Sequence, residues 1–370
     1  MVWEEKNVGV TTMKKNILIR ADANHNIGMG HIMRTLSIAD AFTSIGNSVC
    51  FLLADDTVQS LVRSRGYKTV VLHSDYKRME DEIWPQDIYA DLIIVDSYYV
   101  TADYLFFLRE KMSTVGGKLV YIDDVCAFPY PVDIVIDYNA YATSPLYEDL
   151  YRDSRVRMPQ LILGPTYAPL RSMFRGIEKK EQPKKVENIL ISTGGSDCLH
   201  LSVAIAKAVV SSVKDERFYH FLLGVMNADK EFIQKLAEKD EHIVVHENVT
   251  DMKSLISSMD LAISAAGSTL FEISACGIPL ITYAFADNQL PGAEAFERLG
   301  LAVNVGDLRA SASINPGLVM SGTLDPSAVD RILKAAEELS DNYERRVMMA
   351  KQMQEMIDGF GADRIVKEIL

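Results

Sequence analysis

Short apolar runs alternate with amphipathic segments along the first half of the chain. The apolar runs are rich in Ile, Leu and Val, and the intervening segments, such as 31–45 and 102–112, repeat apolar residues at helical spacing. This alternation is typical of a parallel sheet whose strands are joined by helices. We therefore predict a doubly wound domain with strands at residues 16–20, 49–53, 69–72, 92–95, 119–122, 134–136 and 161–163.

The same alternation restarts after a polar, helix-breaking segment at residues 175–187, where we place an interdomain connection. The second half is predicted to have strands at residues 189–192, 219–223, 243–245, 261–264 and 280–283, and the chain after Pro326 is largely helical. We expect the chain to divide into an extension (1–12) that precedes a second potential start at Met13, a first domain (13–174), a second domain (175–350) and a helical segment that returns to the first domain (351–370).

Composition narrows the class of protein. The 370 residues are 48% hydrophobic and 24% charged, which suits a globular chain with two full cores. A net charge of −13 argues against a nonspecific nucleic-acid binder, and no apolar run is long enough to cross a membrane, so we expect a cytoplasmic protein with a small ligand. The cysteines are too widely spaced for a disulfide framework or a zinc site: Cys50, Cys126, Cys198 and Cys276.

Three glycine-containing turns follow predicted strands and precede predicted helices. Glycine lets the backbone pass close to a bound group, and a helix N-terminus offers free N–H groups and a positive dipole end to an anion such as a diphosphate. Ligands of doubly wound sheets gather beyond the carboxyl ends of the strands, so the three turns can face one cleft between the domains. The alternative is that each turn only relieves steric crowding. The turns contain Gly28 and Gly30, Gly194 and Gly195, and Gly267 and Ser268.

His31 directly follows the first glycine turn and opens the predicted helix. A neutral imidazole at the mouth of a ligand cleft can accept a proton near pH 7. In the second domain, Glu272 falls one turn into the helix that begins near Ser268 or Thr269. Its carboxylate can accept both hydroxyl groups of a ribose, or it can close a capping box with the helix N-terminus.

Two further groups of polar residues follow predicted strands. The amides of Asn288 and Gln289 can bind a sugar, or the pair can simply begin a helix. Asp123 and Asp124 can hold Mg²⁺, but a carboxylate pair in the turn that ends a strand needs no metal, and we predict no metal site.

Taken together, several motifs between residues 16 and 300 carry a family resemblance. They are Arg20-Ala21-Asp22, Ile27-Gly28-Met29-Gly30-His31 with Arg34, Asp96-Ser97-Tyr98, Asn139-Ala140-Tyr141-Ala142, Gly164-Pro165-Thr166-Tyr167 with Leu170-Arg171, Thr193-Gly194-Gly195-Ser196-Asp197, Ile263-Ser264-Ala265 with Glu272, and Asn288-Gln289. This set resembles the UDP-sugar hydrolases of the pseudaminic acid pathway, which remove UDP from UDP-2,4-diacetamido-2,4,6-trideoxy-β-L-altropyranose. It is also similar to the N-acetylglucosaminyltransferase that forms lipid II.

The resemblance implies an α/β fold of GT-B type, with two Rossmann-like domains facing a central cleft, and no cofactor. It implies that His31 is the general base for a water that attacks the anomeric carbon with inversion, and that Tyr98 orients sugar or water, although a tyrosine at this position can also serve packing. The positions implied to bind the UDP-sugar are Asp22, Gly28, Gly30, Arg34, Tyr167, Arg171, Gly194, Gly195, Gly267, Ser268, Thr269, Glu272, Asn288 and Gln289. The chain departs from the family pattern at Ser97, where histidine is common, and in a longer C-terminus.

Three functions are compatible with these features. The first is a UDP-sugar hydrolase that uses water as the acceptor. The second is a GT-B glycosyltransferase, in which His31 would deprotonate an acceptor hydroxyl group instead. The third is a noncatalytic sensor of nucleotide sugars, which would not need His31. The sequence does not indicate an oligomeric state.

Overall fold

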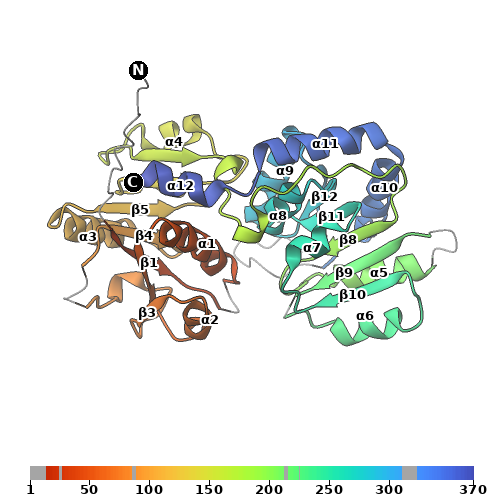
Figure 1. The fold of residues 1–370 in the computed structure, drawn as a ribbon, viewed down its shortest axis with the longest axis horizontal. Helices are drawn as coiled ribbons and strands as arrows, with labels where there is room; N and C mark the ends of the chain where they lie inside the picture. Colours follow the sequence, from red (N-terminus) through yellow and green to blue (C-terminus); the bar gives the residue numbers. More distant parts are fainter. Residues whose placement is uncertain (1–13, 25–26, 86–88, 212–215, 225, 311–322) are drawn as a thin grey trace, which may run out of the picture.

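Two parallel sheets organise the chain in the computed structural model (Figure 1). The structure describes residues 14–24, 27–85, 89–211, 216–224, 226–310 and 323–370. Within them, the first sheet has seven strands in the order β3-β2-β1-β4-β5-β6-β7, and the second has six in the order β10-β9-β8-β11-β12-β13. The predicted α/β fold with two doubly wound sheets is confirmed.

The first sheet is built from the apolar runs of the first half. Its central strand β4 is buried at all five positions, as expected where helices cover both faces of a parallel sheet. The strands are β1 (Asn16–Ala21), β2 (Ser48–Leu53), β3 (Lys68–Val71), β4 (Leu92–Asp96), β5 (Lys118–Ile122), β6 (Ile134–Asp137) and β7 (Gln160–Leu163). The helices are α1 (Gly30–Ser44), α2 (Gln59–Ser64), α3 (Ala102–Ser113) and α4 (Ser144–Tyr151), with short 3₁₀ turns η1 (Met79–Asp81), η2 (Pro165–Tyr167) and η3 (Ser172–Phe174).

The second sheet repeats this plan. Its strands are β8 (Asn188–Ser192), β9 (Phe218–Leu223), β10 (Ile243–Glu247), β11 (Leu261–Ala265), β12 (Leu280–Ala284) and β13 (Val303–Asp307). Its helices are α5 (Leu201–Ser211), α6 (Lys230–Ala237), α7 (Met252–Ser257), α8 (Thr269–Cys276) and α9 (Leu290–Arg298), with the 3₁₀ turn η4 (Asp287–Gln289). The edge strand β13 was not predicted, because its residues are only half-buried and do not form an apolar run.

The strand order reverses at the same place in both sheets, between β1 and β4 and between β8 and β11. At such a switch point, the loops that leave the two adjacent strands diverge and open a crevice. Ala21 pairs with Asp96 at the ends of β1 and β4, so the chain segments that follow these residues begin side by side. Ser192 and Ser264 are paired in the same way at the ends of β8 and β11.

Three helices end the chain: α10 (Ala328–Asp341), α11 (Tyr343–Met356) and α12 (Gly361–Ile369). The first two lie with the second sheet, whereas α12 lies against α1 and η2 (Figure 1). Lys118 at the start of β5 donates a hydrogen bond of 2.7 Å from Nζ to the backbone oxygen of Ile369. The predicted extension, residues 1–12, lies outside the described residues. None of the helices in the described part of the chain has the length and apolar character that a bilayer-spanning segment requires.

Candidate active site

A pocket lies where the carboxyl ends of both sheets meet. Every one of the lining segments follows a parallel strand, which is where the switch-point rule places ligands. The polar and aromatic lining residues from the first half are His31, Arg34, Tyr98, Asp124, Tyr138, Asn139 and Tyr141. Those from the second half, together with its lining glycines, are Gly267, Ser268, Phe271, Asn288, Gln289, Gly292 and Phe296. The predicted residues that the structure brings together here are therefore Gly30, His31, Arg34, Tyr98, Gly267, Ser268, Asn288 and Gln289.

His31 is paired with Asp96 at the switch point of the first sheet. Nδ1 of His31 lies 2.5 Å from Oδ1 of Asp96, and the histidine is 4% exposed. Burial alone would raise the pKa of Asp96, but Arg34 and His31 hold it at about 2, so the carboxylate is ionised. An ionised carboxylate only accepts, so we assign the Nδ1 proton of His31 as the donor to Asp96. This tautomer leaves the lone pair of Nε2 free to act as a base.

Arg34 lines the pocket and holds three of the surrounding side chains by hydrogen bonds. It donates from Nε and Nη2 to both oxygens of Asp96, at 2.6 and 2.5 Å. Its Nη1 donates to Oδ2 of Asp124 at 2.7 Å and to the hydroxyl oxygen of Tyr138 at 3.0 Å. The planar guanidinium group therefore fixes the orientation of both carboxylates, those of Asp96 and Asp124. Because each of its nitrogen atoms is engaged by protein, Arg34 orients the His31–Asp96 pair rather than offering a free cation to a phosphate.

Tyr98 lies over His31 and is tied to the next strand. The two rings meet edge to face, with centroids 4.4 Å apart. The Tyr98 hydroxyl donates to Oδ2 of Asp124 at 3.1 Å, and 43% of the residue is exposed. Tyr98 thereby restricts the imidazole ring and still presents part of its surface to the pocket.

The N-terminus of α8 forms the opposite side of the pocket. Its first turn has no side-chain cap, and Gly267 and Ser268 are exposed. Within the described residues, the backbone N–H groups of Ser268 and Thr269 have no hydrogen-bond partner. Uncapped amides at a helix N-terminus are a ready site for an anion such as a phosphate group.

Glu272 does not close the capping box that its spacing allowed. Instead, Arg171 donates to its Oε1 from both Nε (3.0 Å) and Nη2 (2.7 Å), which ties α8 to the segment after η2. Burial raises the pKa of Glu272, and Arg171 opposes that rise. Arg171 thus holds one carboxylate oxygen, while no side chain or backbone group of the described residues is hydrogen-bonded to Oε2.

The other predicted site residues lie outside the lining of this pocket: Asp22, Gly28, Tyr167, Arg171, Gly194, Gly195, Thr269 and Glu272. Asp22 is buried, accepts from the amide of Ala54 at 2.7 Å and pairs with Arg20 at 2.5 Å. Gly28 adopts a φ of +73°, as a turn residue. The turn that contains Gly194 leads to Asp197, whose carboxylate caps the amides of Leu201 and Ser202 and so engages the N-terminus of α5.

Residues that reasoning from the sequence did not place in the site also face this pocket or support it. Asp96 and Asn139 stood in quoted motifs without an assigned role, and Asp124 was weighed only as a metal ligand or a turn residue. Tyr138 and Phe271 meet edge to face with centroids 5.3 Å apart, one ring from each half of the chain. The available signal was position, because Asp96, Asp124 and Asn139 each come at or just after the end of a strand. No group of three or more metal-ligating side chains is found within the described residues.

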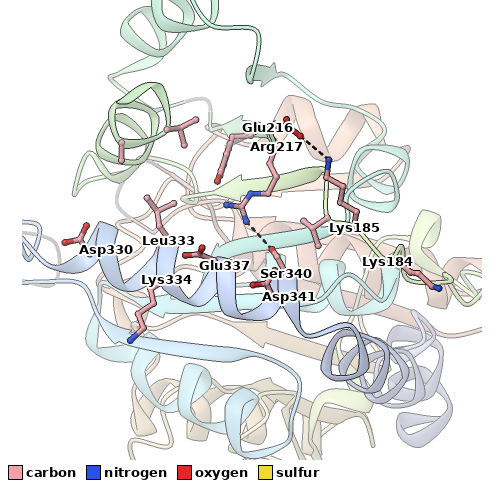
Figure 2. A pocket seen from close by; sticks show the side chains of 14 residues that line it. Lys184, Lys185, Glu216, Arg217, Asp330, Leu333, Lys334, Glu337, Ser340 and Asp341 are labelled. Atoms are coloured by element: carbon pink, nitrogen blue, oxygen red, sulfur yellow. Dashed lines mark hydrogen bonds and ion pairs between the residues drawn. The ribbon is translucent and has the colours of Figure 1, made fainter. Parts of the chain in front are cut away.

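Another hollow lies at the opposite, amino ends of β8 and β9, against α10 (Figure 2). Its lining mixes basic and acidic side chains in equal number: Lys184, Lys185, Arg217, Lys334, Glu216, Asp330, Glu337 and Asp341. Lys185 pairs with Glu216 at 3.4 Å, and Arg217 donates to Ser340 at 3.3 Å (Figure 2). Because the charges balance and lie far from the carboxyl ends of the strands, the cleft with His31 is the better candidate site.

Comparisons with known proteins agree with this architecture. Residues 188–314 match the model of the glycosyltransferase family 28 C-terminal domain. The chain is 29% identical over 256 residues to the UDP-2,4-diacetamido-2,4,6-trideoxy-beta-L-altropyranose hydrolase of Campylobacter jejuni. The aligned region covers 68% of this chain and 85% of that protein. It is 28% identical over 278 residues to an uncharacterized protein of Methanocaldococcus jannaschii, covering 72% of this chain and only 54% of that protein's length.

Solved structures show the same fold. MurG of Acinetobacter baumannii superimposes with a TM-score of 0.61 at 14% identity, over 96% of this chain and 99% of that one. The predicted GT-B arrangement of two Rossmann-like sheets around a cleft is therefore confirmed. The chain has the GT-B fold, its residues 188–314 match the glycosyltransferase family 28 C-terminal domain, and its sequence is similar to that of a UDP-2,4-diacetamido-2,4,6-trideoxy-beta-L-altropyranose hydrolase.

Proposed function

We propose that this protein hydrolyses a UDP-2,4-diacetamido-2,4,6-trideoxyhexose, with His31 as the general base. The observation that carries the proposal is the His31–Asp96 pair in a cleft whose other side is the uncapped N-terminus of α8. A base and an anion site on opposite sides of one cleft are what cleavage of a sugar–diphosphate bond requires. The similarity to the Campylobacter jejuni hydrolase supports this choice of substrate.

In the proposed reaction, Nε2 of His31 takes a proton from water as the water oxygen bonds to the anomeric carbon. The bond from that carbon to the diphosphate oxygen breaks, and UDP leaves with the electron pair. Because water attacks from the face opposite the leaving group, the configuration at the anomeric carbon inverts. The amides of Ser268 and Thr269 stabilise the charge on the departing diphosphate, and Asp96 stabilises the imidazolium that forms.

A second candidate is a glycosyltransferase, which the family 28 match favours. The same geometry would let His31 deprotonate a sugar or lipid hydroxyl group in place of water. Both reactions use the same nucleotide site, so the identity of the acceptor separates them.

The deciding experiment incubates the purified protein with UDP-2,4-diacetamido-2,4,6-trideoxy-β-L-altropyranose without added acceptor or metal. NMR follows UDP, the free sugar and the anomer first formed. Equal amounts of UDP and inverted free sugar, lost in His31→Ala, are expected for the hydrolase. UDP release that requires an added sugar or lipid acceptor would instead establish the transferase. Tight binding with no turnover under either condition would reject both in favour of a nucleotide-sugar sensor.

A further inference from the structure

We propose that the first-domain wall of the cleft selects its sugar through hydrogen-bond acceptors, with Asn139 as the residue that recognises an acetamido N–H group. The wall consists of Tyr98, Asp124, Asn139 and Tyr141. This inference rests on the proposed function for the identity of the ligand, and it assigns a specificity-determining residue within that site.

The carboxamide of Asn139 is held in one orientation from behind. Its Nδ2 donates to Oδ1 of Asp137 at 2.8 Å and to Oδ1 of Asp124 at 3.1 Å. The backbone N–H of Asn139 donates to the same oxygen of Asp137 at 3.0 Å. Asp124 is paired with Arg34, and Oδ1 of Asp137 also accepts from the backbone N–H of Asn139, so both oxygens are acceptors and the NH₂ group must face them. Both of its protons are then engaged, and Oδ1 of Asn139 is the atom left to serve the pocket.

The hydroxyl groups of Tyr98 and Tyr141, like the side chain of Asn139, direct their protons toward protein and leave an oxygen for the pocket. The hydroxyl proton of Tyr98 is donated to Oδ2 of Asp124 (3.1 Å), and that of Tyr141 to the backbone oxygen of Asp124 (2.7 Å). Each hydroxyl group has a single proton, so each phenolic oxygen can only accept from a ligand. Arg34 beneath them directs its donors to Asp96, Asp124 and Tyr138 rather than into the cleft.

Charge reinforces this polarity. The two negative charges of Asp96 and Asp124 outnumber the single positive charge of Arg34, so this wall does not favour a phosphate group. The opposite wall offers the free amides of α8. A ligand that matches both walls carries an anionic group at one end and N–H or O–H donors at the other, as a nucleoside-diphosphate sugar does, and the proposed substrate supplies the N–H donors through its acetamido groups.

An acetamido group and an acetoxy group have nearly the same shape, but only the former has an N–H donor. With the ester in the cleft, Oδ1 of Asn139 would be shut off from water without a partner, which is costly for a polar group. Sites built to hydrogen-bond a ligand discriminate strongly against analogues that lack the bonding group. The chain should therefore prefer the amide over the ester at the sugar carbons that face Asn139.

The test measures dissociation constants for two UDP-sugars, the diacetamido compound and its diacetoxy counterpart, on His31→Ala protein so that no turnover interferes. We expect the amide to bind about 10 to 100-fold more tightly. Asn139→Ala in the same background should bring the two constants to within about threefold while leaving the affinity for UDP alone unchanged. Asn304→Ala, in β13 and outside the lining of the cleft, is the matched control and should preserve the preference. Tyr141→Phe provides a second variant, in which the preference should fall without loss of the ring.

Equal binding of amide and ester by the parent protein would overturn the inference, as would a preference that survives in Asn139→Ala or, if that variant does not fold, in Tyr141→Phe. These outcomes are separate from the fate of the proposed function, which fails if the wild-type protein binds the diacetamido compound without releasing UDP. If neither UDP-sugar binds while UDP does, both the inference and the proposed substrate are wrong.

Discussion

Nδ1 of His31 lies 2.5 Å from a carboxylate oxygen of Asp96, and the same oxygen is held by Arg34 at 2.5 Å. The pair exists because β1 and β4 are neighbours in the sheet, with Ala21 opposite Asp96. The histidine belongs to the first helix and the aspartate to a strand 65 residues later. The fold thus supplies a proton acceptor, an orienting carboxylate and a cation that keeps the carboxylate ionised.

The first prediction concerns this pair. Asp96→Asn should lower kcat by roughly 10²-fold or more, because the imidazole loses the partner that fixes its tautomer and stabilises its charged form. The affinity for UDP should stay within about threefold of the wild-type value, since the amides of α8 are untouched. Steady-state kinetics and calorimetry with UDP measure the two quantities. The neighbouring Ser97→Ala variant serves as the control, and a kcat for Asp96→Asn close to that of the wild type would contradict an orienting role.

A second prediction concerns Glu272, whose Oε1 is held by Arg171. If the other oxygen binds a ribose hydroxyl group, one of the two roles that the sequence allows, Glu272→Gln should weaken UDP binding by about tenfold, the effect of losing one charged hydrogen bond. It should also abolish the preference for UDP over 2′-deoxy-UDP. Calorimetric titration with both nucleotides is the measurement, and Glu294→Gln on the exposed face of α9 is the matched control. A variant that is less stable but keeps the preference would show that the Arg171–Glu272 pair is only a structural tie.

The architecture and the place of His31 in the cleft were predictable because both depend on local patterns. The apolar runs that form the buried strands, and the glycine turn before α1, can be read from neighbouring residues. The partners of His31 could not be found in this way. The contact with Asp96 requires the strand order of the sheet, and Asp124 acquires its role only when Arg34 and Tyr98 converge on it. The turn after β8 gives a second example, since the carboxylate of Asp197 caps the amides of Leu201 and Ser202 at the start of α5, whereas the role predicted for Gly194 and Gly195 stays a prediction.

A third prediction concerns the buried Asp137 beside the site. The Tyr147 hydroxyl lies 2.7 Å from Oδ2 of Asp123 and 3.0 Å from Oδ2 of Asp137, yet it has only one proton. If that proton goes to Asp123, Asp137 must itself carry a proton and donate to Tyr147. The pKa of Asp137 agrees, because burial, followed by the charge of Asp124, raises it to about 8.

A carboxyl group whose pKa is higher in the folded than in the unfolded state keeps a proton that the unfolded chain has lost. Stability therefore falls as pH rises from the ordinary pKa of aspartate toward 8, by up to about 1.4 kcal/mol per pH unit. Asp137→Asn removes this slope, so its stability relative to the wild type should increase between pH 5 and pH 7.5. Urea unfolding across this range is the measurement, with the exposed Asp149→Asn as control. Parallel pH profiles for wild type and Asp137→Asn would rule out a protonated Asp137.

The last prediction concerns α12, which returns from the second half of the chain to lie against α1. Its inner face is fully buried, with Ile365 at 0% exposure, and Gly361 approaches so closely that a Cβ atom would lie 2.1 Å from the backbone oxygen of Ala168. Ile365→Ala should lower the free energy of unfolding by about 2 to 5 kcal/mol, the range for deleting a buried aliphatic side chain. Lys367→Ala, on the exposed face of the same helix, should change it by less than about 0.5 kcal/mol.

Because α1 also carries His31, loosening α12 should reduce kcat well below the temperature at which the chain unfolds. Full activity in Ile365→Ala up to its unfolding transition would show that α12 braces the fold without supporting the site.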